Sequence, residues 1–264
     1  MTGADAEPAP IRVAGLRSAF GEHLVHDGLN LEVRKGEILG LVGGSGTGKS
    51  VLLNTILGLK RPDGGKVEIF GRDVHDPDAS AGIERRAGVM FQGGALFSAL
   101  TVGQNVEAPI HEHTALPNDV VRELARLKIR LVGLDARVAD QMPASLSGGM
   151  RKRAGIARAI ALDPEVLFLD EPTAGLDPMS AADFDQLIRS LCDSLGLTVL
   201  IVTHDLDTLH AITDRIAVLA EKRVIATAPI AELQHSEHAW IKAYFNGPRG
   251  RAAEASYSDE RRTH

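Results

Sequence analysis

Short, almost continuous apolar runs alternate along this chain with longer segments of helical periodicity. Four runs predict buried strands: residues 37–43 (EILGLVG), 87–92 (AGVMFQ), 165–171 (EVLFLDE) and 198–204 (TVLIVTH). Strands that are apolar on both sides are typical of a parallel sheet covered by helices on both faces. The pattern therefore predicts an α/β fold.

Three segments between these runs predict helices with recognisable ends. Residues 49–59 predict a helix that stops near Gly58 and Pro62, and residues 117–133 predict a helix with Pro117 near its start. Residues 178–195 begin at Pro178 and are followed by a glycine, as expected for the start and stop of a helix.

The remaining segments are shorter. Strand-like runs between residues 11 and 70 include 29–34 and 66–71, a hairpin is predicted over 214–228, and short helices over 229–234 and 238–245. Residues 1–10, rich in Ala, Pro and acidic residues, are predicted to be disordered. The segment from Asn246 is rich in Gly, Arg, Ala and Ser, and we expect it to be flexible or bound to a partner.

Composition narrows the class of protein. The 264 residues are 44% hydrophobic and carry a net charge of −6, which argues against non-specific binding to nucleic acid. Cys192 is the single cysteine, so no disulfide framework is expected. No secretory signal is expected, and no apolar run approaches the roughly eighteen residues of a spanning helix. Any link to a membrane is expected to go through a partner.

Each of the four apolar runs ends in residues that could bind a ligand. They are Gly43 onward, Gln92, Asp170 with Glu171, and His204. Because ligands of such sheets bind beyond the carboxyl ends of the strands, we expect one shared site at one edge.

The segment GGSGTGKS at 43–50 matches the phosphate-binding loop G-x-x-x-x-G-K-[ST], with a predicted strand before it and a helix after it. In this loop Lys49 reaches the β- and γ-phosphates, and Ser50 ligates Mg²⁺. The backbone that wraps the phosphate is contributed by Gly43, Gly44, Ser45, Gly46, Thr47 and Gly48. The alternative is a chance glycine turn, which the flanking elements disfavour.

The carboxylates after the third run complete a phosphoryl-transfer site. Asp170 is predicted to belong to the Mg²⁺ shell and Glu171 to activate the attacking water. Gln92 is a candidate for bonding the water or the metal, and His204 for bonding the γ-phosphate. Each has a plainer alternative: a carboxylate pair that caps a helix, a solvated loop glutamine and a histidine at a strand end.

A second candidate anion site begins at LSGG. Ser147, Gly148 and Gly149 precede a basic, alanine-rich helical pattern, so they present a helix N-terminus. A simple helix cap is the alternative. The basic residues that follow are expected to form mainly a solvated face: Arg151, Lys152, Arg153 and Arg158.

The order of these motifs resembles that of an ATP-binding-cassette (ABC) ATPase. The resemblance covers about residues 11–228 and implies a P-loop NTPase: a RecA-like core, an antiparallel β subdomain and a helical signature subdomain near 95–160. It implies an ATPase domain over 11–236, a C-terminal extension over 237–264, and ATP with Mg²⁺ as cofactors.

In that family two copies associate head to tail, which explains the two anion sites. The Ser147–Gly149 segment of one copy would cap the γ-phosphate held by the loop of the other. The resemblance also implies that Asp177 contacts the opposite copy and that Phe20 stacks on adenine, the alternative being a core phenylalanine. Ala174 and Met150 depart from the residues most common in the family.

Residues 91–117 and 146–165 more narrowly resemble the ATPases of Mla/Mce-type lipid transporters. This implies transmembrane permease subunits that contact residues 95–102, an Mce-domain lipid-binding protein, a small accessory subunit and a peripheral place on the cytoplasmic face of the inner membrane. In that group the C-terminal extension packs on the neighbouring ATPase, for which the candidate anchors here are Trp240, Tyr244 and Phe245; the alternative is a helix packed on its own domain. The alternatives are an ATPase of an amino-acid-type importer, a soluble ABC protein and a non-hydrolysing scaffold. His111 and His113 have metal-like spacing, but no further ligand pattern accompanies them.

Overall fold

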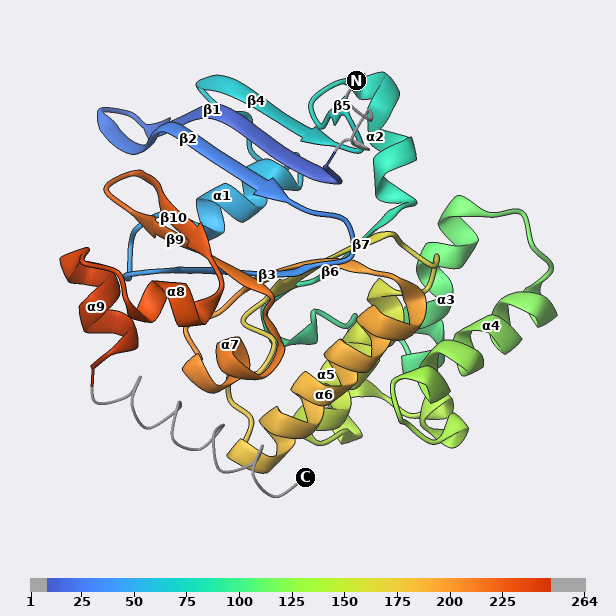
Figure 1. Ribbon diagram of the computed structural model, residues 1–264. Coiled ribbons are helices and arrows are strands. Elements are labelled where there is room, and N and C mark those ends of the chain that lie inside the picture. Colours follow the sequence, from blue (N-terminus) through green and yellow to red (C-terminus); the bar gives the residue numbers. More distant parts are fainter. Residues whose placement is uncertain (1–8, 248–264) are drawn as a thin grey trace, which may run out of the picture.

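The computed structural model describes residues 9–247, which form two sheets with helices between and around them (Figure 1). The four-stranded antiparallel sheet has the order β2-β1-β4-β5. Its strands are β1 (Ile11–Phe20), β2 (His23–Val33), β4 (Gly64–Ile69) and β5 (Arg72–Asp73). The six-stranded sheet has the order β10-β9-β3-β8-β7-β6. Its strands are β3 (Ile38–Gly43), β6 (Ala87–Met90), β7 (Val166–Asp170), β8 (Thr198–Val202), β9 (Arg215–Ala220) and β10 (Arg223–Ala228).

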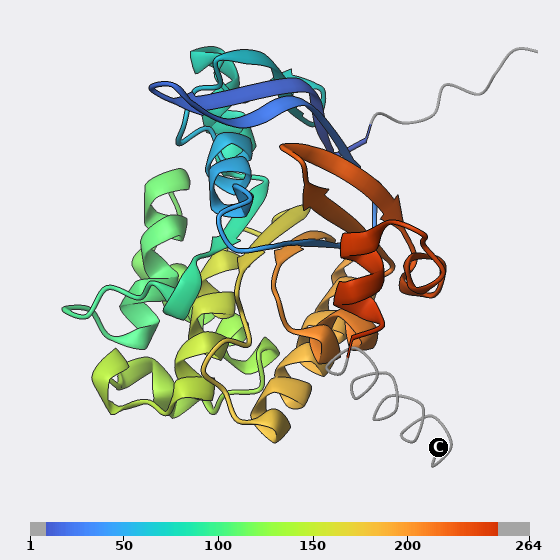
Figure 2. The ribbon, with the colours of Figure 1, turned by 90° about the vertical axis from the view of Figure 1, so that its left-hand side faces the viewer.

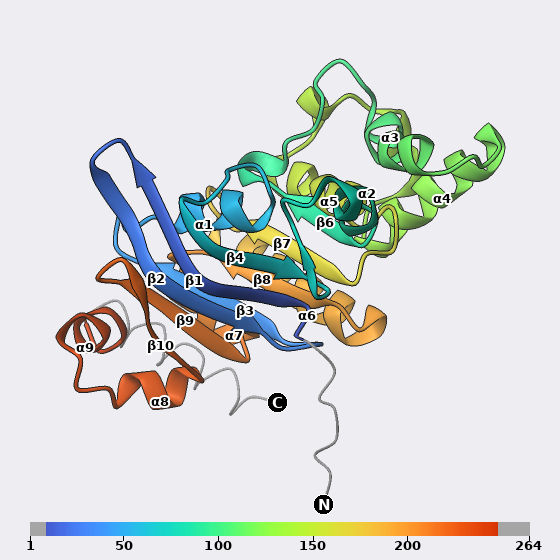
Figure 3. The same cartoon turned by 90° about the horizontal axis from the view of Figure 1, so that it is seen from above.

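The helices occupy three places around this second sheet. Helix α1 (Lys49–Ile56) lies between the two sheets, and α5 (Gly148–Ala159), α6 (Pro178–Leu195) and α7 (Leu206–Ile212) cover the opposite face (Figures 1 and 2). Helices α3 (Val102–His113) and α4 (Asn118–Leu131) lie at one end of the molecule, and α8 (Ile230–Gln234) and α9 (Ala239–Phe245) at the other (Figure 3). Helix α2 (Pro77–Glu84) precedes β6.

The buried strands form as predicted. All residues of β3 and β8 are buried, and β6, β7, β8 and β3 run parallel as neighbours. Helices cover the sheet on both faces, so an apolar residue at every position gains burial. The predicted hairpin is β9 and β10, joined by Glu221 and Lys222, both with positive φ as in the two-residue turns that suit hairpin twist.

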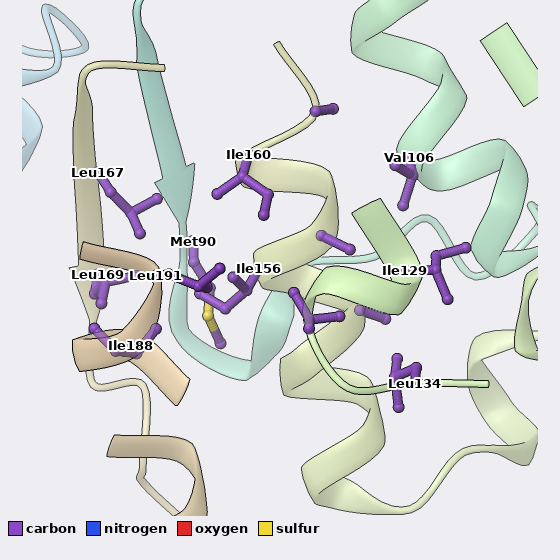
Figure 4. Packing of buried hydrophobic residues seen from close by; sticks show 14 of the residues in the cluster. Met90, Val106, Ile129, Leu134, Ile156, Ile160, Leu167, Leu169, Ile188 and Leu191 are labelled. Atoms are coloured by element: carbon purple, nitrogen blue, oxygen red, sulfur yellow. The ribbon is translucent and has the colours of Figure 1, made fainter. Parts of the chain in front are cut away.

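One apolar cluster joins the parallel sheet to the helical region. It contains Met90 and Leu169 from strands, Ile156 from α5 and Ile188 from α6, together with Ile129 from α4 (Figure 4). Helices α3 and α4 therefore share one core with the sheet, and α5 packs between them and the strands.

Two glycines allow the closest approaches to α5. A Cβ atom on Gly88 of β6 would lie 2.2 Å from the carbonyl oxygen of Ala159, and one on Gly155 would lie 3.0 Å from Gly94. Both neighbours are backbone atoms that cannot rotate away, so these positions require glycine.

The structure adds elements that the apolar pattern did not indicate and moves one boundary. Helices α2 and α7 are not indicated by the apolar pattern, and α2 buries only Ala79 and Ile83 of its eight residues. Pro10, at the end of the segment predicted to be disordered, is buried, and its carbonyl accepts from the Phe70 N–H at 2.9 Å. Residues 1–8 of that segment, and the tail predictions beyond residue 247, lie outside the described residues.

Gly88→Ala is expected to lower the free energy of unfolding by about 1–3 kcal/mol, because its methyl group overlaps the end of α5. Urea unfolding followed by circular dichroism measures this. Gly82→Ala is the control: the nearest atom lies 3.9 Å from its Cβ position on α2, so we expect no loss. Equal effects of the two substitutions would contradict the close approach.

Candidate nucleotide-binding and hydrolysis site

The glycine-rich loop leaves β3 at Gly43 and enters α1 at Lys49. Gly46 and Gly48 have φ of 76° and 99°, a region that favours glycine. A Cβ on Gly48 would also lie 2.5 Å from Val25. The loop is therefore tightly curled against β2, as a cradle for phosphate requires.

Lys49 points into the curve of this loop. Its Nζ donates to the carbonyl oxygens of Gly43 and Gly44 at 2.7 and 3.0 Å. Burial lowers the pKa of Lys49, while the charges of Glu171 and Asp170 oppose that shift. Ser50, the next residue in the first turn of α1, is exposed.

The predicted base and the strand-end histidine are in direct contact. His204 Nδ1 lies 2.8 Å from Glu171 Oε1, and the Glu171 N–H donates to the Val202 carbonyl at 2.8 Å. Glu171 has a φ of 47°, a conformation that costs a non-glycine residue about 1–3 kcal/mol. This strained backbone lies at the end of β7, where the two side chains meet. The next helix, α6, is capped by Asp177 and not by the carboxylate pair.

Asp170 shares its surroundings with Lys49 and Glu171. Burial raises the pKa of Asp170, the neighbouring Glu171 charge raises it further, and Lys49 lowers it. Gln92 is exposed and opens a short 3₁₀ turn, η1 (Gln92–Gly94), two residues after β6. As β6 pairs with β7 through Met90 and Leu169, Gln92 follows the strand next to the one that carries Asp170.

The signature segment lies at the start of α5. Ser147 caps this helix, its Oγ accepting from the Met150 N–H at 3.2 Å. Within residues 9–247 no hydrogen bond or ion pair connects residues 147–149 to the glycine-rich loop. The chain thus has two separate helix N-termini, rather than one combined site.

Two other predicted residues are placed clearly. Asp177 caps α6 by accepting from the Ser180 N–H at 3.0 Å, and these hydrogen bonds lower its pKa. Phe20, at the end of β1, is 56% exposed, with Lys60 Nζ 4.7 Å from its ring centre. It is therefore not a core residue.

The prediction of a solvated basic face on α5 was wrong for Lys152, while Arg151 is exposed and Arg153 and Arg158 are half-buried. Lys152 is buried, and its Nζ donates to the Glu171 carbonyl at 3.4 Å. Arg153 donates to the Val132 carbonyl, and Arg158 to that of Ala95. Single sequence positions carry no signal for these contacts, because each bridges two separate elements.

One of the three predicted anchors on the C-terminal helix is buried in its own chain. Phe245 lies in a cluster with Leu206 and Ile241, whereas Trp240 and Tyr244 are half-buried. Trp240 stacks on Tyr244, and the Tyr244 hydroxyl donates to the His204 carbonyl at 3.3 Å. Burial raises the pKa of Tyr244 to about 12. Helix α9 therefore supports the segment that carries His204.

The H-x-H pair forms no metal centre in the part of the chain that is described. His111 and His113 lie in the last turn of α3, where a histidine interacts favourably with the helix dipole. Across residues 9–247 no group of three or more His, Cys, Asp or Glu side chains is arranged to hold a metal ion. Nor does any helix in that range combine the length and apolarity needed to cross a bilayer.

Several known proteins are similar to this chain in sequence. MlaF of Haemophilus influenzae, an intermembrane phospholipid transport system ATP-binding protein, is 38% identical over 90% of both chains. Mkl of Mycobacterium leprae, a probable ribonucleotide transport ATP-binding protein, is 38% identical over 90% of this chain and 69% of its own. The methionine import protein MetN of Brucella abortus is 40% identical over 85% of this chain and 61% of its own.

A solved structure agrees. The dimeric post-hydrolysis state of the cassette MJ0796, bound to ADP and Pi, superposes with a TM-score of 0.75 at 31% identity, covering 83% of this chain and 98% of that one. The model of the ABC transporter family matches residues 26–174. The chain belongs to the ABC transporter family as one of its ATPases.

Proposed function

We propose that this ATPase powers the movement of phospholipid or a related lipid between the membranes of a cell envelope, with ATP and Mg²⁺ held at the strand edge. The observation that carries the lipid proposal is the 38% identity to MlaF over 90% of both chains. The proposed site residues are Gly43–Ser50, Phe20, Gln92, Asp170, Glu171 and His204 from one copy, with Ser147, Gly148, Gly149 and Asp177 from the other.

In this mechanism Glu171 accepts a proton from the attacking water, and His204 holds the carboxylate in place through their 2.8 Å contact. Lys49 exchanges the Gly43 and Gly44 carbonyls for phosphate oxygens, which places its charge on the transferred group. Tyr244 and Lys152 act on the backbone of His204 and Glu171, so they orient the pair without touching the reacting atoms.

The residues present suit Mg²⁺. Ser50, Asp170 and Gln92 offer oxygen donors, which this hard cation prefers. Asp170 is a single half-buried carboxylate, and the described residues contain no group of three or more His, Cys, Asp or Glu ligands around it. This suits Mg²⁺, which usually binds one or two carboxylates and completes its shell with phosphate oxygens and water. When bound, the ion neutralises charge on the phosphates.

The second half of the site would come from another copy. Ser147 and Gly148 are exposed, and the described residues offer no acceptor to the first-turn N–H groups of Gly148 and Gly149. These donors suit a γ-phosphate bound on a facing subunit. The dimeric state of the MJ0796 cassette supports such an arrangement.

A permease would dock beside Gln92. Exposed Leu59 and Phe91 line an apolar hollow of about 180 Å³ between α1, α2 and β6. Phe97, 53% exposed, lies in the adjoining loop. Within the predicted contact segment 95–102, Val102 is buried and Leu96 packs on the core, so those two residues are not available for docking. Attachment through this surface would make the chain peripheral on the cytoplasmic face of the inner membrane.

The proposed partners are therefore a second copy, permease subunits, an Mce-domain lipid-binding protein and a small accessory subunit, without nucleic acid. An amino-acid-type importer is the alternative function, supported by the 40% identity to MetN. MlaF matches this chain over 90% of its own length and MetN over 61%, which favours the lipid transporter.

The substrate class is tested on the complex purified with its permease partners. We expect phospholipid added in mixed micelles to stimulate ATP hydrolysis by the detergent-solubilised complex, because transported substrate promotes closure around ATP. L-Methionine and ribonucleotides are the comparison ligands. Stimulation by methionine instead would support the importer.

Glu171→Gln is expected to reduce ATP turnover by at least about a hundredfold, because the proton acceptor is lost while the phosphate loop remains intact. The same variant should bind ATP and shift to a dimer in size-exclusion chromatography when ATP is present. Glu165→Gln is the matched control, since Glu165 precedes the same strand and pairs with Arg86 away from the site. Normal turnover in Glu171→Gln would exclude Glu171 as the base.

Replacing Leu59 and Phe97 together by Glu is expected to release the protein from the membrane fraction while ATP binding persists, because charged groups oppose burial against a permease. Leu195→Glu, an exposed leucine at the far end of α6, is the control. The proposed surface is wrong if the double variant sediments with membranes as the unmodified protein does.

A further inference from the structure

A buried carboxyl group lies next to the two segments that carry Glu171 and His204. Asp185, on α6, is only 4% exposed. The Thr208 hydroxyl lies 2.9 Å from Asp185 Oδ2 and 3.3 Å from Asp205 Oδ2. Asp205 follows His204 directly, and its other oxygen caps α7 by accepting from the Asp207 N–H at 3.1 Å. Thr208 thus connects Asp185 to the residue next to His204.

The segment after Glu171 joins the same cluster. Thr173, two residues further on, places its hydroxyl 3.3 Å from both Asp205 Oδ2 and Thr208 Oγ1. Thr173 and Thr208 are both buried. The cluster therefore ties the end of β7 to the end of β8, just behind the contact between Glu171 and His204.

The cluster has fewer hydroxyl hydrogens than hydrogen-bond contacts. Four contacts share only the two hydroxyl hydrogens of Thr173 and Thr208. If Asp185 were ionised, it would compete with Asp205 for the Thr208 hydrogen, and its buried Oδ1, which has no partner, would carry negative charge. A proton on Asp185 Oδ2 removes this conflict. Asp185 then donates to Thr208, Thr208 donates to Asp205, and Oδ1 is a neutral carbonyl.

We propose that Asp185 is a protonated positioning residue, whose O–H directs the Thr208 hydroxyl onto Asp205 and so holds His204 against Glu171. The proposal rests on the functions proposed above for Glu171 and His204. Loss of the proton returns the Thr208 hydrogen to Asp185 and leaves Asp205 with one donor fewer. The His204 segment is then less firmly held.

The surroundings favour the protonated form. Burial raises the pKa of Asp185 to about 7, the Thr208 hydrogen bond lowers it, and the charges of Asp205 and Asp207 on α7 raise it. The elements packed on α6 carry few basic groups that could offset this. Arg189, one turn along α6, pairs with Asp193 and Asp214, Lys152 on α5 reaches the Glu171 carbonyl, and α7 carries His210 in its last turn.

The sign of the pH effect follows. The folded protein keeps a proton that the unfolded chain loses near pH 3.8, so this group's contribution to stability decreases as pH rises from about 4 to 7. The proton is lost as pH rises through about 7. Turnover should therefore decline on the alkaline side.

The test compares Asp185→Asn and Asp185→Val in the purified transporter complex, with ATP hydrolysis measured from about pH 6 to 9 across this pKa. In the unmodified protein we expect kcat to fall above about pH 7 with little change in KM for ATP. Asp185→Asn should retain kcat at alkaline pH, because its amide donates to Thr208 at every pH. Asp185→Val, which has no donor, should lose about tenfold in kcat at every pH through misplacement of the pair.

Infrared spectroscopy gives a readout that does not depend on turnover. The carboxylic acid C=O band of the unmodified protein at about pH 6 should lose one component in Asp185→Asn. Identical alkaline limbs for Asp185→Asn and the unmodified protein, or no change in this band, would overturn the proposal. Normal turnover in Glu171→Gln would instead remove the base assigned above and leave the infrared result intact, so the two failures can be told apart.

Discussion

The parallel hydrogen bonding of β6, β7, β8 and β3 is the constraint on which the site depends. Neighbouring strands align Met90 with Leu169, Asp170 with Val202, and Leu41 with Val202. Residues that follow these positions must emerge at the same edge, because parallel strands all point one way. Lys49, Glu171, Gln92 and His204 come from segments far apart in the sequence, yet strand order alone brings them to that edge.

A second set of contacts fixes the backbone positions of Glu171 and His204. The Glu171 N–H bonds to the Val202 carbonyl, which holds the glutamate in a backbone conformation that it would otherwise avoid. Lys152 from α5 and Tyr244 from α9 each donate to a backbone carbonyl of the Glu171–His204 pair. The proposed catalytic groups are thus supported from α5 on one side and from α9 on the other.

These supports have a consequence for movement. Helix α5 carries the signature segment at its start, contributes to the core cluster and contacts the Gln92 loop where Gly155 meets Gly94. A force on the loop beside the apolar hollow can therefore reach both the signature segment and, through Lys152, Glu171. If a permease docks there as proposed, this continuous packing is a physical route by which docking and ATP hydrolysis would affect one another.

Local patterns in the sequence determine much of this protein. The glycine-rich loop at 43–50, the Asp170–Glu171 pair and the apolar strands are signals within a few residues, because loop curvature, strand burial and strand-end chemistry are set locally. Helix α2 does not stand out in the sequence, since Ala79 and Ile83 are its only buried residues and they form no clear apolar stripe. Only the tertiary structure shows that Lys152 and Phe245 are buried and that Phe20 is exposed. Asp185, Thr208 and Thr173 likewise meet only after β7, α6 and α7 have packed together, and no spacing along the chain encodes a contact that three separate elements create.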